Sequence, residues 1–186
     1  LTFYGVGHTA NVFVDGQLQG SHYGAYGSFM IPLKNMEDMR HTICVEADNS
    51  YSEASALHID NDYYSYLGLT RPVVLEQIDK AFIKWIHVTP EHSGKDYNDG
   101  QWNLKVSVCV ENISDAQQKM NLALYLSSDD ESVAGKTPEV VLPVCLEAGQ
   151  TETFSCTVQC KDVTAYTPQN PVMYYVHAQL QDDFQN

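Results

Sequence analysis

The chain has 186 residues, 44% of them hydrophobic, which is enough for one or two domains with a sizeable core. Its 10 basic and 24 acidic residues give a net charge of −14, and so acidic a surface repels phosphate backbones and anionic lipid. We therefore expect neither nucleic acid nor a membrane as a partner, and no apolar run approaches the roughly 18 residues that span a bilayer. The chain opens on Leu1 instead of Met, in a strand-like pattern and without a signal peptide, which indicates a fragment of something longer.

The five cysteines predict free thiols. They are odd in number, form no CxxC and have no zinc-like spacing. Cys156 and Cys160 are the closest pair, and on an extended strand they would lie about 13 Å apart. A disulfide needs Cα atoms within ~7 Å. We therefore expect reduced thiols in a cytosolic protein, and a cytoplasmic location.

Residues 1–78 predict short strands joined by tight turns. Residues 1–6 alternate as one strand, and residues 11–18 form two strands around Asp15-Gly16, a dipeptide that tolerates the positive φ of a hairpin turn. Residues 20–29 interleave glycines with aromatic residues, which predicts a loop whose backbone bends sharply while its rings pack. Further strands are expected at residues 42–47 and 73–78.

The second part of the chain has longer strands. Residues 102–111 alternate strictly between apolar and polar types, which is typical of a half-buried strand and places Cys109 on the polar face. A polar loop is expected at residues 91–100. Other strands are expected at residues 82–88, 120–126, 140–146, 153–160 and 172–180. This spacing predicts an antiparallel sandwich, and no helical period survives more than one turn.

Residues 60–75 hold the densest set of polar and aromatic groups in the chain. A glycosidase needs two carboxyl groups, about 5–5.5 Å apart for retention and ~6.5–9.5 Å apart for inversion. Asp60 and Asp62 could form such a pair, could coordinate a cation or a sugar hydroxyl, or could be a solvated, turn-capping pair, and we favour the last. Arg71 could bind a carboxylate ligand, although an ion pair with a nearby acid is the favoured role.

The remaining sequence offers few catalytic candidates. The seven histidines show no spacing beside a carboxylate that would indicate zinc. His22, inside its glycine- and tyrosine-rich stretch, is the least ordinary of them. No serine elbow, phosphate-binding glycine loop or Cys/His pair is present.

Five short motifs, in order, resemble glycoside hydrolase family 2, the family of β-galactosidases, β-glucuronidases and β-mannosidases. The typical forms are F-x-G-V, V-N-G, G-x-H-x-G-G-Y, V-x-V-D-N and G-G-I/L-Y-R. They are similar, in that order, to Phe3–Val6, Asn11–Gly16, Gly20–Phe29, Val45–Asn49 and Gly68–Val73. Asn170–Tyr174 is similar to the family's N-P-x-L-Y. Four positions depart from the pattern and bear on substrate more than on fold: Asp15, Ala25, Leu67 and Thr70.

The resemblance implies an all-β chain. Residues 1–78 would form a sugar-binding jelly roll without its first strands, and residues 79–186 an immunoglobulin-like β-sandwich. In this family the catalytic glutamates lie on a separate (β/α)₈ barrel, so the chain would be a non-catalytic accessory region of a retaining β-glycosidase, β-galactosidase-like. Its partner would be a carbohydrate substrate bound through that barrel, and the parent protein could be a homo-oligomer.

The resemblance also implies one site residue. Aligned on Gly68 and Arg71, Asp62 corresponds to the family's aspartate that helps hold a sodium ion and the sugar in the barrel's active site. No catalytic residue and no cofactor are expected in the chain itself, only sodium in the parent enzyme.

Two alternatives stay open. The chain could be an independent carbohydrate-binding module, with sugars stacked on Tyr23, Tyr26, Tyr63, Tyr64 and Tyr66. It could also be a structural or adhesion pair of sandwiches.

Overall fold

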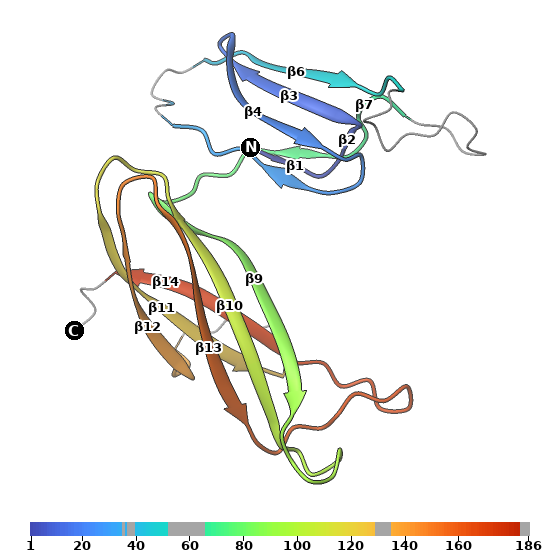
Figure 1. Cartoon of the computed structure of the whole chain (residues 1–186), viewed down its shortest axis with the longest axis vertical. Coiled ribbons are helices and arrows are strands. Elements are labelled where there is room, and N and C mark those ends of the chain that lie inside the picture. Colours follow the sequence, from blue (N-terminus) through green and yellow to red (C-terminus); the bar gives the residue numbers. More distant parts are fainter. Residues whose placement is uncertain (35, 37–39, 52–65, 129–134, 183–186) are drawn as a thin grey trace. The chain divides into compact units, whose positions relative to one another are not determined.

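The computed structural model describes residues 1–34, 36, 40–51, 66–128 and 135–182, and in these ranges every regular element is a strand (Figure 1). The expectation of an all-β chain is confirmed. The chain divides into two compact units, Leu1–Gln77 and Ile78–Asn186. The predicted assignment of residues 1–78 as sugar-binding and 79–186 as immunoglobulin-like stays a prediction. The described segments include no helix long and apolar enough to cross a bilayer.

Unit 1, Leu1–Gln77, is made of short antiparallel strands. They form three small sheets, in the orders β4-β3-β6, β5-β1-β8 and β2-β7. Phe3, Val6, Ala10, Val12 and Ile31 are buried together in its core. The strands are β1 (Thr2–Phe3), β2 (Val6–Gly7), β3 (Thr9–Val14), β4 (Gln17–Tyr23), β5 (Phe29–Met30), β6 (Ile43–Asp48), β7 (Gly68–Leu69) and β8 (Val73–Val74).

The hairpin between β3 and β4 turns on Asp15 and Gly16, as predicted. Both residues have positive φ, 49° and 79°, which the hairpin turn requires and which Asp and Gly adopt at low cost. The Asp15 carboxylate also accepts hydrogen bonds from the Thr42 amide at 2.8 Å and from Nδ1 of His41 at 2.7 Å. The turn residue therefore ties the hairpin to the start of β6.

Several predicted elements of unit 1 have different bounds. The single strand expected over residues 1–6 is two strands of two residues each, interrupted at Tyr4 and Gly5. The strand expected over residues 73–78 is limited to β8. The glycine-rich stretch 20–29 is not all loop, because Gly20–Tyr23 continues β4 and pairs with β3. Pairing with a partner strand, which local sequence does not specify, decides each of these limits.

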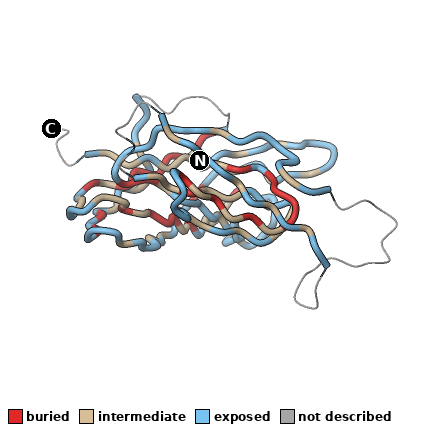
Figure 2. The backbone as a smooth tube through the Cα atoms, turned by 90° about the horizontal axis from the view of Figure 1, so that it is seen from above, coloured by how far each residue is buried: buried red, intermediate tan, exposed pale blue. Residues whose placement is uncertain are grey.

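Unit 2, Ile78–Asn186, packs two three-stranded antiparallel sheets. Their orders are β13-β10-β9 and β12-β11-β14, and Figure 1 shows β9, β10 and β13 side by side. Val106, Val108 and Val110 of one sheet and Leu122 and Leu124 of the other are buried between them; Figure 2 shows such buried residues as red stretches along the strands. The strands are β9 (Ala81–His92), β10 (Trp102–Asn112), β11 (Gln118–Ser127), β12 (Val140–Leu146), β13 (Thr151–Cys160) and β14 (Tyr175–Asp182).

Cys109, which was expected on the polar face of its strand, is buried. Its side chain points away from the valines of β10, as the alternation predicts, yet the residue is only 5% exposed. Its partner across the sheet is Trp85 of β9, so a large indole shares that face with the thiol, and a β-bulge follows at once between Cys109 and Val110. The polar face is thus covered at this point. All five cysteines are free thiols, as expected.

Candidate functional site

The glycine- and aromatic-rich stretch of unit 1 is held by ring stacking. His22, at the end of β4, stacks on Phe29 with ring centroids 4.1 Å apart, and Phe29 stacks on Phe3 at 4.8 Å. Nε2 of His22 is buried and has no hydrogen-bond partner among the described residues. His22 therefore packs with the core of unit 1, which is a structural role.

His8 connects this stretch to β2 and β6. It is 5% exposed, and the edge of its ring meets Tyr23 at a centroid distance of 4.6 Å. Its carbonyl accepts a hydrogen bond from the Gly24 amide at 2.9 Å, and its amide donates to the Asp48 carbonyl at 3.3 Å. The loop after β4 is therefore fixed to the start of β3 through one buried histidine.

Arg71 binds backbone in the described part of the chain. Its Nη1 donates to the carbonyls of Tyr26, at 3.2 Å, and Tyr4, at 3.5 Å. Its aliphatic stem lies so close to Gly5 that a Cβ there would be 3.1 Å from Cδ of Arg71. One guanidinium thus joins the loop after β4 to the turn between β1 and β2. Asp60 and Asp62, the acids nearest to Arg71 in the predicted site, lie outside the described residues.

Three exposed tyrosines surround these contacts. Tyr23 is 53% exposed, and Tyr26 and Tyr66 are each 71% exposed. The Tyr66 carbonyl lies directly on Gly7, where any side chain would collide with it, so Tyr66 adjoins the segment that carries His8. We call the set Tyr23, Tyr26 and Tyr66 the tyrosine end of unit 1. Exposed rings held by a rigid backbone can stack on a flat apolar face of a ligand.

Asp48, whose backbone carbonyl accepts a hydrogen bond from the His8 amide, carries a carboxylate in this region. Hydrogen bonds from the Ser50 hydroxyl and amide hold the pKa of Asp48 below its ordinary value. The carboxylate is therefore ionised at neutral pH and cannot supply a proton. Among the described residues, no three His, Cys, Asp or Glu side chains gather as a metal site.

Only some of the residues that the sequence predicts for the site lie among the described residues. Tyr23, Tyr26, Tyr66 and Arg71 lie in the described part, and the structure brings them to one end of unit 1. Asp62, the residue predicted for sugar and sodium, lies outside the described residues, as do Asp60, Tyr63 and Tyr64. The buried role of His8 was missed, because its neighbour in space, Tyr23, is fifteen positions away and joined to it only by strand pairing.

No family model matches the chain. A curated protein of Formosa agariphila, named "Putative beta-glucuronidase", is 27% identical over 125 residues, which is 67% of this chain and 15% of that protein. The solved GH2 β-galacturonidase of Eisenbergiella tayi, bound to galacturonate, is 39% identical with a TM-score of 0.80, over 97% of this chain and 30% of that one.

A more distant structure repeats the fold. The β-glucuronidase of Bacteroides uniformis is 19% identical with a TM-score of 0.74, over 98% of this chain and 22% of that one. At this identity the likeness concerns the fold alone. The chain spans less than a third of the length of each of these proteins, all of which are named as β-glycosidases.

Proposed function

We propose, from the premise that this chain is a segment of glycoside hydrolase family 2, that it serves as a non-catalytic accessory region of a retaining β-glycosidase. One observation carries the proposal. The chain aligns over 97% of its length with a GH2 enzyme and accounts for 30% of that enzyme. Most of such a protein, including the barrel expected to hold the catalytic glutamates, would then lie outside this chain.

The geometry of the tyrosine end supports binding over catalysis. Its described polar groups are the buried His8, the half-buried His22, an arginine that binds backbone carbonyls and an aspartate held ionised by Ser50. Retaining hydrolysis needs a protonated acid beside a carboxylate nucleophile. The tyrosine end instead offers exposed rings on a fixed backbone, which suits it to border a sugar site built by another domain.

For the substrate we propose a β-uronide. The 39% identical enzyme is named a β-galacturonidase and is bound to galacturonate, and the curated protein is named "Putative beta-glucuronidase". These names support the proposal of galacturonides or glucuronides over the β-galactosides that the motifs alone suggested. Asp62 remains our proposed contact to the sugar and to a sodium ion in the assembled active site.

The test uses the longer protein that contains this chain. We expect it to release p-nitrophenol from a β-galacturonide or β-glucuronide faster than from a β-galactoside, and we expect residues 1–186 alone to release none. Preference for the galactoside would contradict the uronide proposal only. Hydrolysis by the 186-residue chain, lost on Asp62→Asn, would contradict the accessory role itself.

A second candidate function is an independent carbohydrate-binding module. The exposure of Tyr23, Tyr26 and Tyr66 on one end of unit 1 is the observation that favours it. Titration of the 186-residue chain with galacturonate, glucuronate and their oligomers separates the two candidates. Saturable binding that is lost on Tyr26→Ala would support a module, and no binding up to millimolar sugar would rule it out.

A further inference from the structure

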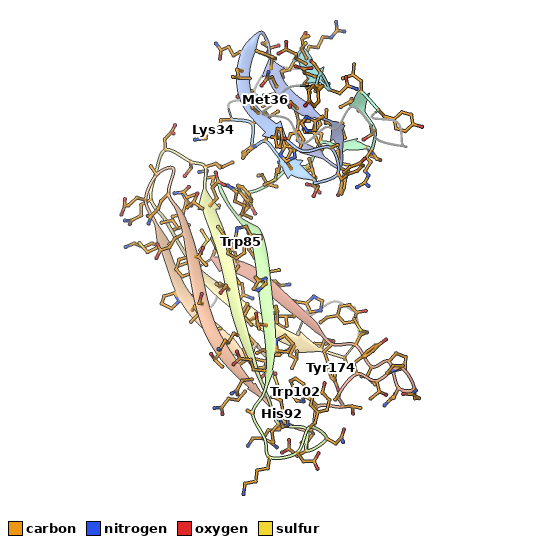
Figure 3. The ribbon with its side chains drawn as sticks, turned by 45° about the vertical axis from the view of Figure 1, so that its right-hand side comes forward. Lys34, Met36, Trp85, His92, Trp102 and Tyr174 are labelled. Carbon is orange, nitrogen blue, oxygen red and sulfur yellow. The ribbon has the colours of Figure 1, made fainter. Side chains whose placement is uncertain are left out.

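One end of unit 2 contains an apolar cavity of about 370 Å³. Its floor is formed by Val88 of β9 and Leu104 of β10 from one sheet, and by Leu126 of β11 and Val176 of β14 from the other. It therefore opens between the two sheets, where Figure 3 labels Trp102, His92 and Tyr174. A volume in this range is typical of small-molecule sites.

One wall of the cavity is the loop between β9 and β10. Hydrogen bonds to Asp99, a residue of the same loop, hold it in place. The Asp99 carboxylate accepts hydrogen bonds from the amides of Lys95 (2.8 Å), Asp96 (3.2 Å) and Gln101 (3.0 Å) and from Nε2 of His92 (3.1 Å). These bonds, that from Gln101 foremost, lower the pKa of Asp99 to about 2. The loop's polar groups thus pair with one another, and Tyr97 is left to face the cavity.

The rings of this wall pack edge to face. Trp102 meets Tyr97 at a centroid distance of 5.3 Å and an angle of 78°, and meets His92 at 5.4 Å and 73°. Such pairs hold rings in fixed orientations. The Trp102 indole nitrogen is buried without a hydrogen-bond partner among the described residues. Trp102 therefore presents its carbon surface to the cavity and keeps its polar atom inside the wall.

The second wall is the segment between β13 and β14. The Thr164 amide donates to the Tyr174 hydroxyl at 3.0 Å, which uses the polar end of that ring. Thr167 and Asn170 close a turn through amide-to-carbonyl bonds in both directions. Both walls are thus fixed by bonds within themselves, and a preformed cavity costs a ligand little ordering free energy.

The lining carries no charged side chain. Its two sulfur atoms belong to Met173 and Cys160; Cys160 is buried, and desolvation raises the pKa of its thiol, so the thiol stays neutral at physiological pH. Aromatic surface comes from both walls: Tyr97 and Trp102 on one, Tyr166 and Tyr174 on the other. Such a lining cannot compensate the lost hydration of an ion, and the chain's net charge of −14 further disfavours anions.

We propose that this cavity is a binding site for a neutral, planar aromatic molecule of about two fused rings, held between the aromatic walls. The 370 Å³ cavity is large enough to admit a molecule of this size, and it lies within the range of small-molecule sites. The ligand class is distinct from the anionic uronides proposed for the parent enzyme. This site and that function can therefore fail independently.

The test compares 2-naphthol, which is neutral at pH 7, with 2-naphthoate, which has the same rings and a negative charge. Calorimetric titration of the 186-residue chain should give saturable, sub-millimolar binding of 2-naphthol and binding of 2-naphthoate at least about tenfold weaker. Trp85→Phe leaves Trp102 as the single tryptophan, and its indole N–H resonance should shift as 2-naphthol is added.

Ala165→Trp is the blocking variant, because Ala165 lines the cavity and a partly exposed indole there would fill it. Val141→Trp is the matched control, since Val141 is 50% exposed on β12 and does not line the cavity. We expect Ala165→Trp alone to abolish 2-naphthol binding, with its unfolding temperature confirming that it folds. Equal binding of both probes, unchanged binding by Ala165→Trp, or binding by the chain but not by the longer protein would overturn the proposal.

Discussion

The carboxylate of Asp99 occupies the space beside the Gly94 Cα that a side chain at Gly94 would need. The same carboxylate accepts hydrogen bonds from the amides of Lys95 and Gln101, so it holds the loop between β9 and β10 together. A glycine is needed here for space and not for its backbone angle, since Gly94 is not among the residues with positive φ.

Gly94→Ala should therefore destabilise unit 2. The methyl group would displace the Asp99 carboxylate and break several of its hydrogen bonds, at an expected cost of ~1–3 kcal/mol. Chemical denaturation measures the change. Ser93→Ala, one residue earlier and exposed, is the control and should have little effect. Equal stability of Gly94→Ala and the unchanged chain would show that the loop accommodates the methyl group.

Asp99 also predicts a pH dependence. Its folded-state pKa, about 2, lies below the unfolded value near 3.9, so its contribution to stability is complete above pH ~4 and is lost as pH falls toward 2. Asp99→Asn should lower the unfolding temperature at neutral pH and reduce its dependence on pH between 4 and 2. The pKa values of Asp15 and Asp48 are lowered too, so the difference between the variant and the unchanged chain is what isolates Asp99. Identical pH profiles would contradict this prediction.

Asn112 is a densely bonded side chain in the described part of unit 2. It is fully buried at the end of β10, and its Nδ2 lies within hydrogen-bond distance of the carbonyls of Ala116, Leu146 and Glu147. Its Oδ1 accepts from the amide and hydroxyl of Ser114. One side chain thus joins the β10–β11 turn to the end of β12.

Asn112→Leu keeps a side chain of similar volume and removes every hydrogen bond of the Asn112 amide group. The carbonyls that this group binds are then left unpaired. We expect a loss of about 3 kcal/mol in the free energy of unfolding. Asn98→Leu, in the exposed loop before β10, is the matched control and should cost far less. Denaturant titration with an unchanged slope would attribute the loss to the folded state, and a loss as small as the control's would show that water replaces the amide.

Whether a structural feature of this chain can be predicted from its sequence depends on how far apart in the sequence the interacting residues lie. The alternation of residues 102–111 is local and correctly predicts β10, and Asp15-Gly16 correctly predicts the β3–β4 turn. The bounds of the two-residue strands β1, β2, β5, β7 and β8 depend on distant partners, such as Val6 with Leu69, and were not predicted. Cys109 was placed on the correct face but not recognised as buried, because Trp85 opposes it from another strand.

The candidate site likewise combines features that the local sequence predicts with contacts between distant residues that it does not. The sequence identified the tyrosines as possible sugar-stacking residues and Arg71 as a separate candidate, expected to form an ion pair. It could not show that Arg71 binds the Tyr26 carbonyl, because backbone carbonyls carry no sequence signal and the two residues are 45 positions apart. The cavity of unit 2 was missed for a similar reason. Its lining comes from five strands and two loops, and no single stretch contains enough of it to form a pattern.

Arg71 provides the last prediction. If its main role is to join the Tyr4 and Tyr26 carbonyls, Arg71→Ala should loosen the loop after β4 and increase amide hydrogen exchange at Gly24, Tyr26 and Gly27. Arg71→Lys should recover only part of the protection, because a compact ammonium group does not reproduce the position of Arg71 Nη1, which donates to both carbonyls. Arg40→Ala, which removes an exposed arginine of the same unit, is the control for lost charge. Exchange that rises equally in Arg71→Ala and Arg40→Ala would show that net charge, and not the two carbonyl contacts, holds the tyrosine end in place.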